Sequence, residues 1–204
     1  MGQILAIDEL LSARTVWRGG AATPLIDPEP TGHAALDDAL PLGGWPRHSI
    51  TEILLPADGV GEIDLLLPTL SRLTQAGKKV VLVGCPYIAY APGWRSRGID
   101  LRHVHLIEAD AKQSVWAFEQ CLRSGACAAV VGWPQRIDQH ALRRLQCAAD
   151  SGQSLGFVLR DKRHADNASP APLRLEISID RHVCVRKCRG GPPPPGSFPL
   201  PIFH

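Results

Sequence analysis

Short apolar runs alternate along the chain with longer stretches of helical periodicity. The apolar runs predict β-strands at residues 50–55, 79–84, 103–107, 127–132 and 154–159. The amphipathic stretches between them predict helices at residues 34–40, 64–76, 93–98, 112–124 and 138–151. Strands this apolar, separated by helices, are typical of a parallel sheet covered on both faces. The predicted fold class is therefore α/β, with a mainly parallel central sheet and helices on both sides.

The pattern changes after Arg160, where a polar, turn-rich segment leads into the strictly alternating residues 173–180. This alternation predicts a half-buried strand whose apolar face carries Leu173, Leu175, Ile177 and Ile179. A turn near Asp180 and Arg181 then leads to a partner strand at residues 183–186.

The two ends of the chain differ from this central region. Residues 4–18 place apolar side chains on one helical stripe, and a Gly-Gly pair and a Pro-rich linker follow. At the other end, the Pro-rich residues 191–204 predict polyproline II or no regular structure. Their apolar side chains suit a preformed ligand for a partner groove or an end without fixed structure: Phe198, Leu200, Ile202 and Phe203. We therefore expect a helix and linker over residues 1–30, one domain over 31–190 and a tail over 191–204.

Composition adds limits on compartment and partners. The chain has 204 residues, of which 45% are apolar, as in a globular domain. Its six cysteines form no CxxC pair, and neither a signal segment nor a membrane-length apolar run is visible, so we expect a cytoplasmic protein with reduced thiols and no membrane contact. Charge is uneven. Residues 1–70 hold three Lys and Arg against ten Asp and Glu, whereas residues 71–204 hold nineteen against ten. Such asymmetry suits head-to-tail contact with a related subunit, approach to a polyanion, or simply a solvated surface.

The segment LLPADGVGEIDL, residues 54–65, has the form of a phosphate-binding loop between a strand and a helix. Where the pattern GxxxxGK[ST] places Lys and Ser or Thr, this loop has Glu62 and Ile63. Its remaining elements are Pro56, Gly59 and Gly61. Three carboxylates surround the turn and would repel a triphosphate by several kcal/mol, on the order expected for a partly desolvated site: Asp58, Glu62 and Asp64. The same carboxylates favour the start of the following helix, so the protein caps its own loop.

Two other positions agree with the loss of nucleotide chemistry. The strand at 127–132 ends in Gly132-Trp133-Pro134, without an Asp to orient Mg²⁺, and the strand at 79–84 runs into Cys85-Pro86-Tyr87, without a carboxylate to activate water. We therefore expect a degenerate nucleotide loop, no cofactor and no enzymatic activity. A metal site is not expected either, because His103 and His105 have no evident third ligand and Cys184 and Cys188 have no second pair.

The order of these segments resembles the core of RecA recombinases. The pieces are Thr31-Gly32, Leu36-Asp37, Gly43-Gly44-Trp45-Pro46 and the strand entering the loop, followed by KKVVLVG, RGIDLRHV and the two closing strands. The resemblance covers residues 31–190 and implies a RecA-like P-loop fold. The catalytic positions depart from the recombinase pattern at Glu62, Ile63, Pro86 and Gly132.

Two families of RecA-like proteins without ATPase activity are similar to this chain. ImuA proteins, accessories of translesion synthesis in the SOS response to DNA damage, resemble it in an N-terminal helix and in TEILLPADGVGE, LLLPTL, ALRRLQ and a late RGGP. SulA cell-division inhibitors resemble it in LLLPTL, RSGACAAVVGW and LGFVLR, but they are shorter and lack the Gly-Gly-x-Pro opening and the Pro-rich end. We interpret the chain as ImuA-like. The resemblance then implies contacts with ImuB, an error-prone polymerase and RecA, whereas the SulA alternative implies contact with FtsZ.

Two groups of residues are candidates for partner binding. Tyr87, Trp94, Arg95 and Arg97 follow a strand's carboxyl end, where open parallel sheets bind ligands, although Trp94 and Tyr87 could equally be packing residues. Arg160, Lys162 and Arg163 begin the segment where recombinases keep a DNA-binding loop. No aromatic residue interleaves them, so direct DNA contact stays open beside a solvated basic face.

Overall fold

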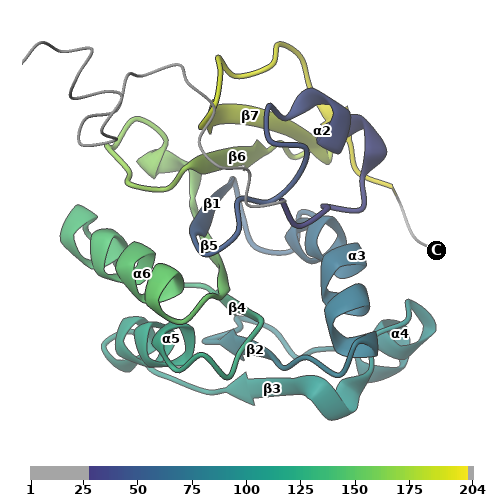
Figure 1. Ribbon diagram of the computed structural model, residues 1–204, viewed down its shortest axis with the longest axis vertical. Coiled ribbons are helices and arrows are strands. Elements are labelled where there is room, and N and C mark those ends of the chain that lie inside the picture. The colour runs from purple at the N-terminus through teal and green to yellow at the C-terminus, as the bar shows by residue number, and fades with distance from the viewer. Residues whose placement is uncertain (1–27, 202–204) are drawn as a thin grey trace, which may run out of the picture.

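The computed structural model describes residues 28–201, which form one eight-stranded sheet in the order β3-β2-β4-β5-β1-β6-β7-β8 (Figure 1). Six neighbouring strands, from β3 to β6, run parallel to one another, and β7 and β8 are added antiparallel at one edge. The strands are β1 (Ile50–Leu55), β2 (Val80–Val83), β3 (Val104–Ile107), β4 (Ala129–Gly132), β5 (Leu155–Asp161), β6 (Leu173–Ile177), β7 (His182–Cys188) and β8 (Phe198–Pro199).

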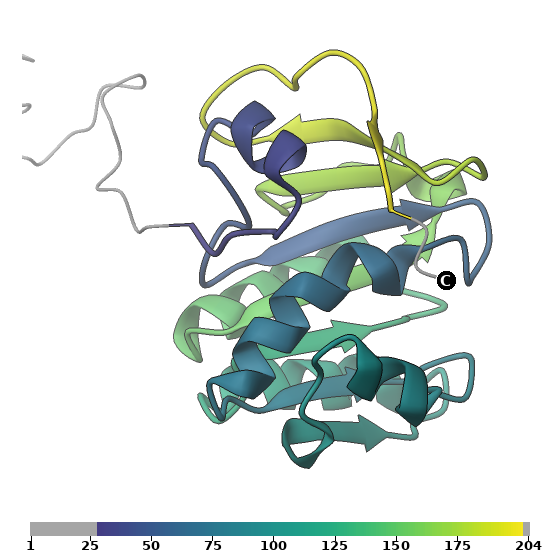
Figure 2. The same ribbon diagram turned by 90° about the vertical axis from the view of Figure 1, so that its right-hand side faces the viewer.

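Helices cover both faces of this sheet (Figure 2). One layer holds α2 (Ala34–Ala39), α3 (Glu62–Gln75) and α4 (Ala91–Ser96), and the other holds α5 (Gln113–Arg123) and α6 (Gln139–Ser151). Short 3-10 turns, η1 (Leu101–His103) and η2 (Lys162–His164), precede β3 and follow β5. The prediction of an α/β fold with a mostly parallel sheet flanked by helices is confirmed.

Alternation within the strands divides the core into two layers. In β2, Val80 and Leu82 pack with the α3 layer, whereas Val81 and Val83 pack with Phe118 and the α5–α6 layer. Both faces of such a strand are buried, which explains why its sequence is continuously apolar rather than alternating.

The opening segment before β1 is part of the same core. Trp45 is fully buried, packs edge-on against Phe157 at 5.1 Å between ring centroids and donates from Nε1 to the Thr69 hydroxyl at 2.8 Å. A side chain at Gly44 would place its Cβ 2.5 Å from the carbonyl oxygen of Glu29, so this turn requires glycine. Glu29 and Trp45 form an antiparallel bridge here, which fixes the Gly-Gly-Trp-Pro turn on the domain.

Two expectations about the last part of the chain are wrong. Phe198 and Pro199 form β8 instead of polyproline II or an irregular end, because their backbone pairs with His182 and Val183 of β7. Leu200 is buried there, and its N–H donates to the Arg181 carbonyl at 2.8 Å, so this residue is not free to enter a partner's groove. Ile202, Phe203 and the predicted helix at residues 4–18, with its linker up to residue 27, lie outside the described residues.

The strand predicted at residues 173–180 is also shorter than expected. β6 ends at Ile177, and Ile179 is 72% exposed in the turn before β7 instead of lying on the buried face. Arg181 has φ of 60° in this turn, and the Ser178 N–H donates to the His182 carbonyl. The chain therefore reverses direction after Ile177, although the alternation of apolar and polar residues continues to residue 180. Over residues 28–201, no helix combines the length and apolarity that a membrane span needs.

Candidate functional site

The loop between β1 and α3 is closed by its own glutamate. Glu62 is the first residue of α3 and is 1% exposed. Its carboxylate accepts hydrogen bonds from the N–H of Gly59 at 2.8 Å, the N–H of Gly61 at 3.1 Å and the hydroxyl of Tyr87 at 2.9 Å. The backbone donors that such a turn would offer to an external anion are therefore directed at a side chain of the protein itself.

Tyr87 completes this arrangement from the loop after β2. Burial, and then the negative charge of Glu62, raise the pKa of the Tyr87 phenol far above its usual value, so the hydroxyl stays protonated and donates. Its ring packs edge-on against Trp133 with 5.8 Å between centroids. Gly61 makes the turn possible, because its φ of 113° lies in the left-handed region and a Cβ there would lie 3.0 Å from the Arg181 guanidinium.

The next carboxylate, Asp64, is neutralised by two arginines. Its two oxygens lie 2.8 Å from Nη1 of Arg97, which follows α4, and 2.7 Å from Nη2 of Arg181, in the β6–β7 turn. Arg97, predicted as a partner-binding residue, thus contacts the first turn of α3.

A cleft of about 910 Å³ opens across the carboxyl ends of the parallel strands. Five neighbouring strands of the sheet contribute residues at or near their carboxyl ends: β3, β2, β4, β5 and β1. This is the edge at which open parallel sheets bind ligands. Its lining includes Asp58, Tyr87, Ile88, Leu106, Glu108, Trp133, Arg136, Arg160, Asp161 and Arg163.

The charges in the cleft are unevenly compensated. Within residues 28–201, Asp58, Glu108 and Arg136 have no ion-pair partner, whereas Asp161 lies 3.6 Å from Arg163. Burial, followed by the charges of Glu62 and Asp161, raises the pKa of the Asp58 carboxyl. The floor beside the closed loop is therefore electronegative.

Arg160 does not lie on the exposed basic surface where it was expected. It is 6% exposed and pairs with Glu52, which is fully buried in β1 and also accepts from Nε of Arg174 at 2.9 Å. Its second terminal nitrogen, Nη2, donates to the carbonyl of Ile137 at 3.1 Å. This buried triad joins β5, β1 and β6. Sequence reasoning missed it because Glu52 lies 108 positions from Arg160 in the chain.

The other candidates are scattered. Trp94 is 7% exposed and belongs to the core on the α3 side, so it is a packing residue and not an exposed contact. Arg95 and Lys162 are exposed but do not line the cleft. Of the predicted partner-binding residues, only Tyr87, Arg160 and Arg163 contribute to its lining.

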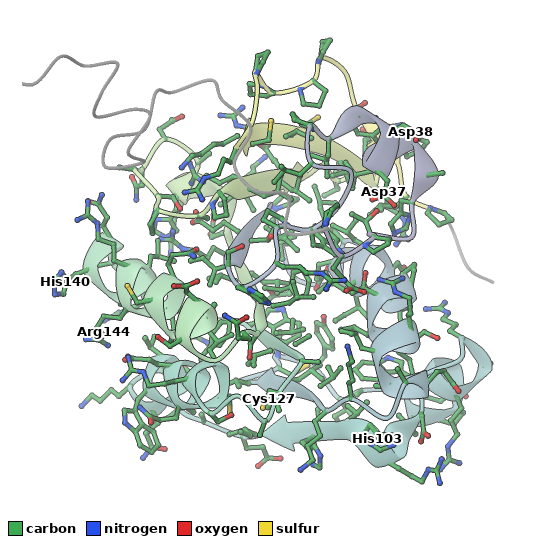
Figure 3. The ribbon with its side chains drawn as sticks, viewed as in Figure 1. Asp37, Asp38, His103, Cys127, His140 and Arg144 are labelled. Atoms are coloured by element: carbon green, nitrogen blue, oxygen red, sulfur yellow. The ribbon has the colours of Figure 1, made fainter. Side chains whose placement is uncertain are left out.

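Charged side chains also lie away from the cleft. Figure 3 shows His140 and Arg144 on the outer side of α6. Arg144 lies 3.0 Å from Glu119 of α5, which also pairs with Arg123 at 2.8 Å, so part of this basic surface is neutralised. Among residues 28–201, no three His, Cys, Asp or Glu side chains are grouped to hold a metal ion.

Several cleft residues were not singled out from the sequence. Ile88, Glu108 and Arg136 each lie within a few positions of a strand's carboxyl end, so collecting the residues that follow each predicted strand would have found them. Leu106 lies inside β3 itself and carries no such signal, because its exposure depends on β3 being an edge strand.

Comparisons with known proteins show similarity to SulA and RecA proteins. The family model described as "Cell division inhibitor SulA" matches residues 48–156, just over half of the chain. The chain is 29% identical over 184 residues to Protein RecA of Brucella anthropi, a match that covers 88% of this chain and 48% of that protein. It is 30% identical over 107 residues to Protein RecA of Streptomyces avermitilis, covering 52% and 28%. The chain thus spans about half, or less, of the length of the curated relatives it matches. Among solved structures it is similar to SulA from Pseudomonas aeruginosa, with a TM-score of 0.46, 24% identity and coverage of 54% of this chain and 96% of that one.

Proposed function

Because the chain belongs to the SulA family and is similar to RecA proteins, we propose that it is a RecA-like accessory protein without ATPase activity. It acts through protein contacts in the response to DNA damage. The observation that carries this proposal is the carboxylate of Glu62 inside the β1–α3 loop, where it receives three hydrogen bonds.

Glu62 opposes nucleotide binding in two ways. It occupies the N–H groups of Gly59 and Gly61, so a phosphate would have to break these bonds before it could bind. Its charge, with that of Asp58 nearby, would also repel a triphosphate by several kcal/mol, on the order expected in a partly desolvated site. We therefore interpret the segment as a phosphate-binding loop that has degenerated and takes no cofactor.

Within the DNA-damage response, we assign the protein to SOS-induced translesion synthesis. Two segments outside the SulA family match support this role: the opening residues 28–47, fixed through Trp45, and the Pro-rich end that carries β8. The resemblance distinguishes an ImuA-like chain from a SulA-like one by these two parts. The proposed partners are an ImuB-like protein, an error-prone polymerase and RecA, all reached in the cytoplasm.

The second candidate function is inhibition of cell division by binding FtsZ. It is favoured by the description of the matching family and by the position of that match, which includes five of the six parallel strands, in whole or in part.

Co-purification separates the two candidates. The tagged full chain, expressed at its native level in cells treated with a DNA-damaging agent, should bring down the translesion polymerase and the ImuB-like protein. Undamaged cells carrying the same tagged chain provide the control. Enrichment of FtsZ without either polymerase component would contradict the translesion role and favour the division-inhibitor role.

A further inference from the structure

Exposed apolar side chains gather at one end of the strand-end cleft. Five large apolar residues are well exposed within residues 28–201, and two of them line the cleft: Ile88, at 96%, and Leu106, at 57%. A third, Tyr90, lies two positions beyond Ile88 in the same loop. A group of exposed apolar side chains beside a hollow is typical of a site that a partner covers.

The acidic excess in the cleft is local to Asp58, since the lining as a whole has three carboxylates, Asp58, Glu108 and Asp161, and three arginines, Arg136, Arg160 and Arg163. Arg160 pairs with the buried Glu52 and Arg163 with Asp161, so neither pairs with Asp58. Asp58 also faces the charges of Glu62 and Asp161. A cation placed beside Asp58 would reduce this repulsion, whereas an anion would increase it.

Trp133 forms an apolar part of the cleft wall, where it is 6% exposed and packs edge-on against Tyr87.

We infer that this cleft binds an extended basic peptide segment of a partner protein. A bulky apolar side chain of the segment contacts Ile88 and Leu106, and an arginine or lysine lies beside Asp58. The inference rests on the proposed function, since it names the kind of partner segment that a protein acting through contacts would bind. The hollow, of about 910 Å³, is within the size that ligand sites commonly have.

A displayed library of random short peptides, selected on the immobilised full chain, tests this inference. We expect the enriched peptides to share an arginine or lysine close to a large aliphatic or aromatic residue. Synthetic versions of these peptides, labelled with a fluorophore, then serve as the probe for affinity measurements by fluorescence anisotropy.

Two substitutions address the two contacts separately. Asp58→Asn removes the charge with little change of shape and should weaken binding of the basic peptide about tenfold, which corresponds to about 1.4 kcal/mol. Ile88→Ser should weaken it by a similar factor. Their matched controls are Asp38→Asn, an exposed carboxylate on α2, and Ile179→Ser, an exposed apolar residue in the β6–β7 turn, and neither should change affinity.

Enriched peptides that are acidic, or affinities that the Asp58 and Ile88 substitutions leave unchanged, would overturn the inference. Circular dichroism of each variant establishes that it is folded before its affinity is interpreted. The outcome is separable from that of the proposed function: if both cleft variants still co-purify the translesion partners, the cleft is not the docking site, but the accessory role stands.

Discussion

Glu62 and Asp58 lie four residues apart in the same turn, yet the fold treats their charges in opposite ways. Glu62 is buried and receives three hydrogen bonds, whereas Asp58 lies at the cleft surface with no ion pair and with two other carboxylates nearby. The comparison shows that the carboxylate of Glu62 is satisfied by donors of its own protein, whereas the charge of Asp58 remains available at the adjoining cleft. Exposure of the carboxylates increases in the order Glu52, Glu62, Asp64 and Asp58.

The largest effect is expected at the buried triad. Arg160→Ala leaves Glu52 fully buried with only Arg174 as an ionic partner, and loss of one member of a buried pair typically costs about 3–5 kcal/mol. Denaturation in urea, followed by circular dichroism, measures the free energy of unfolding. The matched control is Lys162→Ala, on the exposed η2 turn, which should change stability by no more than about 0.5 kcal/mol. Equal effects of the two substitutions would contradict the buried role of Arg160.

The next largest loss of stability is expected for Glu62, whose carboxylate accepts three hydrogen bonds in the loop. Glu62→Ala removes the acceptor of the Gly59 and Gly61 N–H groups and of the Tyr87 hydroxyl, and leaving the buried Gly61 donor and the two partly buried donors unsatisfied costs about 1–3 kcal/mol. Glu108→Ala, at an exposed carboxylate of the cleft, serves as the control and should be nearly neutral. Urea denaturation of both variants measures the difference. A neutral Glu62→Ala would show that the loop does not depend on its carboxylate.

Substitution of Asp64 should change stability less than substitution of Glu62 and more than substitution of Asp58. Asp64→Asn weakens two ion pairs, to Arg97 and Arg181, but both arginines are partly exposed, so solvent screening limits the loss to about 1 kcal/mol. Thermal unfolding at low and high salt distinguishes this effect from a packing defect, because the difference between wild type and variant should shrink as ionic strength rises. A loss that is insensitive to salt would argue against an electrostatic cause.

Asp58 should show the smallest effect and the opposite sign. Its pKa is raised in the folded protein, so the charged form is disfavoured at neutral pH and Asp58→Asn should stabilise the fold. Because Asp58 is largely exposed, solvent screening limits this gain to no more than about 0.5 kcal/mol. As the pH falls through the raised pKa toward 3.8, the ordinary value of an aspartate carboxyl, the wild type takes up a proton and this advantage disappears. Unfolding curves measured across this range test the prediction. A variant that is less stable than wild type at neutral pH would contradict it.

Much of the fold was predictable because local pattern and tertiary environment agree. The strands β1, β2, β4 and β5 are buried on both sides because helices cover both faces, whereas the edge strand β3 is partly exposed. The predicted helices match α2 to α6 within a few residues. The prediction failed for Ile179 and for residues 198–200. In both places the outcome depends on which strand lies alongside, and a local pattern does not contain this information.

The candidate site was predictable only in part, for the same reason. The residue types at Glu62 and Gly61 indicated a loop that caps itself, but the third donor, Tyr87, comes from 25 positions along the chain. Arg160 and Trp94 looked like surface contacts because arginine and tryptophan are frequent in interfaces, yet distant partners bury both. The cleft itself combines the ends of five strands, so its composition follows from the order of the strands in the sheet.

Isothermal titration calorimetry of the full chain with ATP and Mg²⁺ tests the central claim most directly. With the Glu62 carboxylate bound by the loop, we predict no heat of binding at micromolar to millimolar nucleotide, for the wild type and for the Asp38→Asn control alike. Saturable binding of MgATP with micromolar affinity, reduced by substitutions in the loop, would contradict the account of a closed loop and an accessory role without ATPase activity.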